Sequence, residues 1–267
     1  MKLFGNHKEH PPSLATPTSE HRELSRDLDL VEIPLEGVAA YWLSLHKVLQ
    51  EKKASRLRII SDEAAYTTEP YVSHLLEIAF TDFSDDLVRR YATIKQETIL
   101  RDLSRKLVLI SIGLLGIATN ENPQQVLVRI ISKFPVSPIL EKQVFETASD
   151  LIAKHGRDNL QVDVDHRMHI ETLIVHLIFF CMLARRQGRE ACQPYLEKIR
   201  SLYFTEGLSL IIDNFDADFI KHRLNLQKSE ILNETRRKMS MSLEMCLAIR
   251  NSVVYDDVFK VATSFLL

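Results

Sequence analysis

Glycine is scarce in this chain: seven of 267 residues, where about 7% is usual in soluble proteins. Folds rich in β-strands and α/β folds need glycine at their turns and in their phosphate-binding loops. The sequence contains no glycine-rich loop of the P-loop or dinucleotide-binding kind, which argues against nucleotide binding by a backbone cradle. We expect no cofactor.

Cysteine is also scarce, with only three residues and no CxxC spacing. A zinc site or a disulfide framework is therefore not indicated. Cys181 lies within an apolar run and is expected to be a small buried residue. Residues 1–12 contain no apolar segment of the kind found in signal peptides, so we expect a reducing, cytoplasmic location.

Long hydrophobic runs are absent as well. The longest are residues 107–118 and 170–184, both shorter than the roughly 20 residues needed to cross a bilayer. We therefore predict no transmembrane segment and expect both runs to form buried core helices.

Neither sign of charge dominates. The chain has 34 Lys and Arg against 36 Asp and Glu, for a formal net charge of −2. This near balance argues against a dedicated nucleic-acid binder. The HExxH and GxSxG strings are absent too, which lowers the expectation of a zinc protease or an α/β-hydrolase.

The chain does contain long stretches of apolar residues at helical spacing, rich in Leu, Ile, Glu, Lys and Arg. Together with the low glycine content they predict an all-α fold, a multi-helix bundle or stacked helical hairpins. Expected helices cover residues 36–53, a segment starting near 69–70, 84–118, 123–134, 139–155, 163–186, 195–203 and 219–249, followed by an apolar tail at 258–267. Gly113 and Gly116 are expected to bend or end the helix over residues 84–118. Gly188 is expected to end the helix over residues 163–186.

The N-terminal segment differs from the rest. The first 27 residues combine three prolines with Ser, Thr, His and charged side chains. We predict that residues 1–34 form a flexible leader. Residues 28–35 roughly alternate apolar and polar. We expect them to lie extended and packed on their own domain; the alternative is that they lie along a groove or add to a sheet edge. The all-helical domain then covers residues 35–267, with a subdomain break expected near 156–165.

One histidine pair could ligate a metal. If a helix begins at Asp163 or Asp165, His166 and His169 stand at i and i+3 on one face, and with a carboxylate from elsewhere they could bind one ion. His176 lies about 15 Å further along such a helix and cannot join that site. The competing interpretation is that the pair belongs to a polar first turn and that His176 is a core residue.

The C-terminal part suggests contacts with a protein partner. The last long helix carries flexible methionines, and the chain ends in consecutive apolar residues. The predicted partner-binding residues are Met241, Met245, Phe259, Phe265, Leu266 and Leu267. The tail packs on its own bundle or docks into a partner or a sister subunit.

These observations favour a non-catalytic cytoplasmic interaction protein: an adaptor, a chaperone-like factor or a subunit of a larger assembly. Its partners would be other proteins or copies of itself. The first alternative is a helical metal-dependent enzyme centred on His166 and His169. The second is a nucleic-acid accessory subunit that uses Arg185, Arg186 and Arg189.

Overall fold

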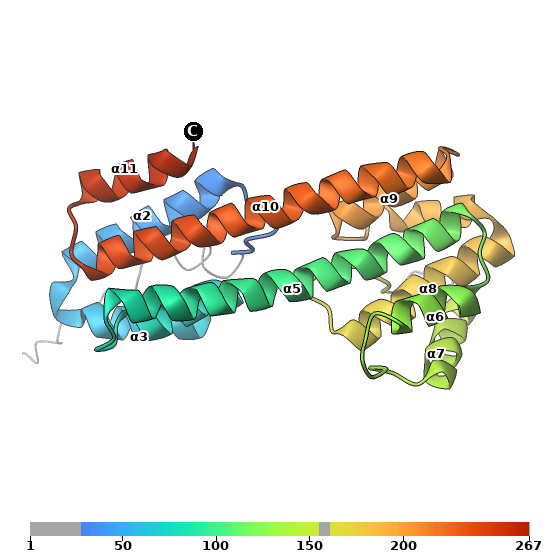
Figure 1. The fold of residues 1–267 in the computed structure, drawn as a ribbon, viewed down its shortest axis with the longest axis horizontal. Helices are drawn as coiled ribbons and strands as arrows, with labels where there is room; N and C mark the ends of the chain where they lie inside the picture. The colour runs from blue at the N-terminus through green and yellow to red at the C-terminus, as the bar shows by residue number, and fades with distance from the viewer. Residues whose placement is uncertain (1–27, 155–160, 267) are drawn as a thin grey trace, which may run out of the picture. The chain divides into compact units, whose positions relative to one another are not determined.

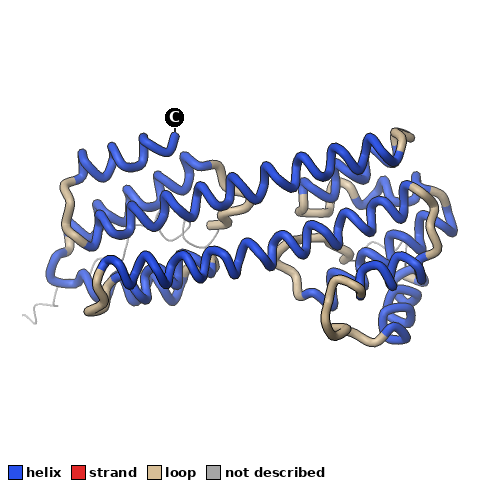
Figure 2. The backbone as a smooth tube through the Cα atoms, in the orientation of Figure 1, coloured by secondary structure: helices blue, strands red, loops and turns tan. Residues whose placement is uncertain are grey.

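The computed structural model describes residues 28–154 and 161–266. All regular elements in these two ranges are helices (Figures 1 and 2), which confirms the predicted all-α fold. None of the helices in this part of the chain is both long and apolar enough to cross a bilayer.

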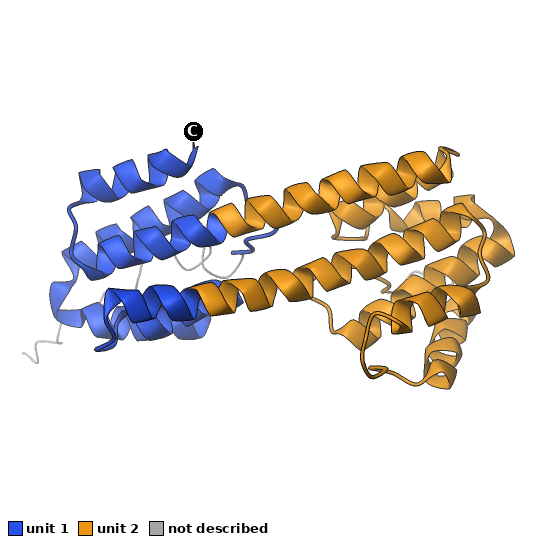
Figure 3. Ribbon diagram, viewed as in Figure 1, with its two compact units in different colours: residues 1–92, 238–267 blue, residues 93–237 orange. Residues whose placement is uncertain are grey.

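The chain divides into two compact units (Figure 3). Unit 1 comprises residues 1–92 and 238–267, and unit 2 comprises residues 93–237. The boundaries fall within the long helices α5 (Asp85–Ala118) and α10 (Ala217–Arg250) rather than near residues 156–165. Residues 155–160 of that expected break, and residues 1–27 of the expected leader, lie outside the described residues.

Unit 1 is a helical bundle. Its elements are α2 (Leu35–Glu51), η1 (Lys53–Ser55), α3 (Arg56–Tyr66), α4 (Pro70–Ala79), the first turns of α5, the last turns of α10 and α11 (Tyr255–Leu266). Helix α3 packs on α4, and α11 packs on α2. The sequence pattern did not predict α3, because its buried residues are only Ile60 and the charged Glu63. The Glu63 carboxylate accepts a 2.8 Å hydrogen bond from the Tyr41 hydroxyl.

Residues 28–34, which the sequence assigned to the leader, pack within unit 1. Leu28 and Leu30 are buried. The Leu30 N–H donates a 3.0 Å hydrogen bond to Glu69 Oε2, and the Glu69 side chain also caps α4 by accepting from the Tyr71 N–H. The segment is not extended as expected, because the Ile33 N–H donates to the Asp29 carbonyl and closes a turn.

Arginines hold the helix ends of unit 1. Arg56 donates from Nη2 to the carbonyls of Ile249 (2.6 Å) and Arg250 (3.2 Å), which satisfies groups left open at the C-terminus of α10. Arg89 of α5 forms an ion pair with Glu244 of α10. Arg56 and Arg89 therefore connect helices within unit 1.

Unit 2 is built around a buried helix. Its elements are the rest of α5, α6 (Pro123–Ile131), α7 (Glu141–Ala153), α8 (Ile170–Gln187), η2 (Arg189–Tyr195), α9 (Leu202–Ile212) and the first turns of α10. Helices α6, α7 and η2 all pack on α8. Apart from His176, its residues 173–184 are buried, which confirms the predicted core helix. Phe179 and Phe180 of α8 contact Tyr195 of η2 edge-on, and the Phe180 ring also lies at a tilt against Phe204 of α9.

Two glycines of α5 have a packing role. Neither Gly113 nor Gly116 ends the helix, since α5 continues to Ala118. A Cβ at Gly116 would lie 2.5 Å from Val126 Cγ2 of α6, and one at Gly113 would lie 3.2 Å from Leu177 of α8. The glycines therefore allow two neighbouring helices to approach α5 closely.

The helix end predicted at Gly188 is confirmed, and other helix ends are marked by local side chains. The Asn122 side chain caps α6 ahead of Pro123, and Gly188 ends α8 with a φ of +92°. Two predicted starts are wrong. Helix α8 begins at Ile170 instead of residues 163–165, because the Asp165 side chain accepts from the Arg167 N–H and forms a turn. The helix expected over 195–203 is instead η2 and then α9, which Ser201 caps.

Candidate functional site

The two candidate metal-binding histidines do not share a helix. His166 lies in the turn before α8, and His169 is the N-cap residue of that helix. The i, i+3 helical geometry on which the metal hypothesis depended is therefore absent. His166 instead places Nδ1 3.1 Å from Asp165 Oδ1.

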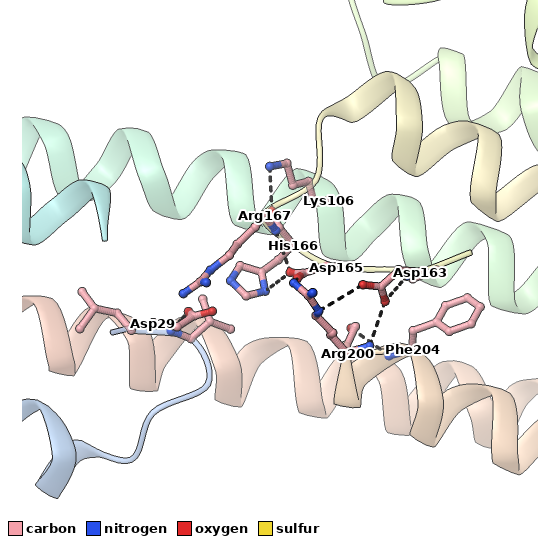
Figure 4. A network of polar contacts seen from close by, with 12 residues as sticks. Asp29, Lys106, Asp163, Asp165, His166, Arg167, Arg200 and Phe204 are labelled. Carbon is pink, nitrogen blue, oxygen red and sulfur yellow. Dashed lines mark hydrogen bonds and ion pairs between the residues drawn. The ribbon is translucent and has the colours of Figure 1, made fainter. Parts of the chain in front are cut away.

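The surrounding carboxylates bind protein donors (Figure 4). Asp163 Oδ1 accepts from the Arg200 N–H at 2.9 Å, and its Oδ2 lies 3.5 Å from Arg200 Nε. Arg200 Nη1 lies 3.8 Å from Asp165 Oδ2, and Lys106 Nζ donates to the His166 carbonyl at 2.8 Å. This network holds the segment before α8 against α5 and the start of α9. Within residues 28–154 and 161–266, no group of three or more His, Cys, Asp or Glu is placed to hold a metal ion.

His176 is held inside unit 2. Its Nδ1 lies 2.5 Å from the Asp163 carbonyl, the geometry expected when the ring donates to that oxygen. Burial lowers the pKa of His176 below its ordinary value, and the contacts with Asp163 offset this in part. This agrees with the interpretation of His176 as a hydrogen-bonded core residue.

The three cysteines are buried and free. Burial raises the pKa of the Cys181 thiol and raises those of Cys192 and Cys246 to about 12. Because the thiolate is the reactive form, all three are protonated and unreactive near neutral pH.

Two of the predicted partner-binding residues face the interior. Met241 and Met245 are fully buried within unit 1, on the face of α10 that forms its core. Their flexible side chains fill space between helices and offer no surface for a partner.

Helix α11 carries the remaining predicted partner-binding residues. Its buried face consists of Val258 and Ala262 and packs on α2. Phe259 is 49% exposed and Leu266 is 37% exposed. Phe265 is half-buried, and Leu267 lies outside the described residues.

An exposed apolar stripe runs along α11. At about 100° per residue, Tyr255, Phe259 and Leu266 lie within about 40° of one another, directly beside the buried face. We call these three residues the α11 stripe. Tyr255, which is 39% exposed, was not among the predicted residues. Its i, i+4 spacing from Phe259 is the signal that identifies it.

Polar groups flank the α11 stripe at its N-terminal end. Asp256 and Asp257 are exposed in the first turn, where carboxylates are favourable. Lys260 Nζ lies 2.7 Å from Asp257 Oδ1. The Tyr255 ring lies 6.0 Å from that of His46, which places the first residue of α11 beside α2.

The arginines of the nucleic-acid hypothesis do not act as one group. Arg185 and Arg186 are exposed in the last turn of α8. Arg189 instead donates from Nη2 to the Ala118 carbonyl at 2.5 Å and from Nη1 to Asn214 Oδ1 at 3.2 Å. It therefore closes the ends of α5 and α9.

No protein-family model matches the chain, and comparisons with curated proteins and with solved structures gave no match either.

Proposed function

We propose that this chain is a non-catalytic interaction protein that binds an amphipathic helix of a protein partner through the α11 stripe. The observation that carries the proposal is the position of Tyr255, Phe259 and Leu266 beside the buried face of α11. The proposal places the protein in the cytoplasm, where thiols such as its buried cysteines stay reduced.

The spacing of the stripe suits a helix as the bound element. Its residues stand at i, i+4 and i+11 and extend over about 16 Å of helix axis. A partner helix that lies along α11 would place its own apolar residues against all three. Aromatic side chains often supply much of the binding energy at protein interfaces, and the stripe contains two of them, Tyr255 and Phe259.

Exposed apolar residues at the same i, i+4 and i+11 spacing also occur at Phe215, Phe219 and Leu226, around the start of α10. Leu57 on α3 is 70% exposed, but isolated apolar residues are common on protein surfaces. The α11 stripe lies directly beside Val258 and Ala262, the buried residues of its own helix. Docking would therefore extend an existing apolar surface rather than create a new one.

Site-specific photo-crosslinking tests the proposal on the full chain in cells. A photo-reactive phenylalanine analogue replaces Phe259, and the matched control carries it at the exposed Leu57. We expect one discrete protein adduct from position 259. Mass spectrometry of that adduct shows whether the partner is another protein or a second copy of this chain.

The adduct must depend on the rest of the stripe. With Tyr255→Asp and Leu266→Asp added, we expect the yield from position 259 to fall to the level of the control position. Equal yields from positions 259 and 57, or an adduct that persists in this variant, would contradict the proposal.

A further inference from the structure

A second surface lies in unit 2, in a groove between α5 and α10 that encloses about 650 Å³. Most of its lining residues come from one face of each helix, and Lys133 is added from the segment after α6. The lining consists of Glu97, Leu100, Arg101, Ser104, Arg105, Val108, Lys133, Ser229, Leu232, Asn233 and Arg236.

The groove follows regular helical spacing. The residues from α5 stand at steps of three and four between positions 97 and 108, and those from α10 stand at the same steps between 229 and 236. The α5 face extends over about 16 Å at 1.5 Å per residue. This length corresponds to about three turns of a helix lying in the groove.

Positive charge dominates the lining, with four cations against the single carboxylate of Glu97. Arg236 lies 3.4 Å from Glu97, and the Arg105 guanidinium lies 5.6 Å from the Phe134 ring centroid. Within the described residues, the side chains of Arg101 and Lys133 form no hydrogen bond or ion pair. Two cations are thus available to a ligand.

The groove also has an apolar component. Leu100 is buried, and Val108 and Leu232 are half-buried. No aromatic side chain lines it, whereas single-stranded nucleic acids are bound by stacking on aromatic rings. Cations beside aliphatic side chains fit a peptide with carboxylates on one edge and apolar residues on the other.

We propose that this groove binds an acidic amphipathic helix of a protein partner. Glutamates or aspartates of that helix pair with Arg101, Arg105 and Lys133, and its apolar residues contact Leu100 and Leu232. The inference is independent of the α11 stripe, which lies on unit 1. Residues 1–27 of this chain are not a complementary occupant, because they contain four Lys and Arg against four Asp and Glu.

A peptide selection on the full chain provides the test. A randomised library of helical peptides of about 14 residues is selected on wild-type protein. Only peptides that also bind the Phe259→Asp variant are kept, which removes those that bind α11. We expect the survivors to be acidic, with Leu or Ile at i, i+4 spacing.

Affinities of the selected peptides then locate the site. Fluorescence anisotropy should show at least about 10-fold weaker binding to Arg101→Glu. The matched control is Lys221→Glu, the same charge reversal at an exposed position of α10 outside the groove, with affinity within about 2-fold of wild type. Both positions are exposed, so thermal melts should match that of wild type.

Several results would overturn the proposal. These are a selection that yields no survivors, survivors without net negative charge, and survivors that bind Arg101→Glu as well as wild type. A short single-stranded RNA that binds more tightly than the peptides, and loses affinity with Arg101→Glu, would identify the groove as a nucleic-acid site instead.

Discussion

Helices α8 and α11 are both apolar, but they differ in how much of their surface is covered. Helix α8 is enclosed by α6, α7 and η2, and its residues from Leu173 to Ala184 are buried except for His176. Helix α11 packs on α2 along one face and leaves the α11 stripe open. Apolar content alone does not distinguish a core helix from a docking helix. In these two helices the difference lies in how many of the apolar side chains are buried.

The largest expected effect is in α8. Leu177→Ala removes a fully buried side chain that packs closely on Gly113 of α5, and should lower the free energy of unfolding by about 2–5 kcal/mol. Leu57→Ala is the control, with a change below about 0.5 kcal/mol. Urea denaturation followed by circular dichroism measures both, and similar values would contradict the contrast between enclosed and exposed leucines.

A smaller loss is expected in α11. Val258→Ala removes two buried carbon atoms at about 0.8 kcal/mol each, or about 1.6 kcal/mol. The loss cannot exceed the free energy that holds α11 on α2, since the helix can detach while the bundle stays folded. Limited proteolysis should show faster cleavage near residue 258. A loss as large as that of Leu177→Ala would show that α11 belongs to the core.

The third expected effect depends on pH and involves His176 of α8. Because its folded-state pKa is lowered, the unfolded state binds a proton more readily, and stability should fall as pH drops below about 6.5. His46 of α2, whose pKa burial also lowers, should contribute in the same direction. His176→Gln should reduce the fall in melting temperature between pH 7.5 and 5.5, and His222→Gln at an exposed position of α10 should not. Equal falls in both variants would exclude His176 as a source.

The smallest effect on stability is expected at the α11 stripe itself. Phe259→Asp should lower the free energy of unfolding by only about 1 kcal/mol, because the ring is half exposed. Binding of the crosslinked partner, measured by titration calorimetry, should nevertheless weaken by at least about 30-fold, a typical loss for an aromatic anchor. Unchanged affinity would exclude Phe259 from the interface.

The sequence predicted the helices whose apolar residues recur at regular spacing and whose ends carry a cap. Asn122-Pro123 and Gly188 mark their boundaries by local chemistry alone. Helix α3 was missed because its buried positions include Glu63, whose partner Tyr41 is distant in sequence. The start of α8 was misplaced because the Asp165 side chain competes with the helix for the Arg167 N–H.

The candidate sites were harder to predict. Met241 and Phe259 follow similar apolar patterns, and only the tertiary structure buries the first and exposes the second. The groove of unit 2 depends on Arg101 and Arg236, which are far apart in the sequence and meet only when α5 and α10 pack. The sequence predicts that each of these arginines lies on a helix, but it does not predict that the two line the same groove.

Hydrogen exchange on the free full-length protein tests most directly whether α11 is held along one face while α8 is enclosed. The amides of residues 258–266 should exchange at least about 100-fold faster than those of residues 173–184, and should slow when the crosslinked partner is added. Equal protection of the two helices in the free protein would contradict this account, because it would show α11 to be as firmly packed as the core.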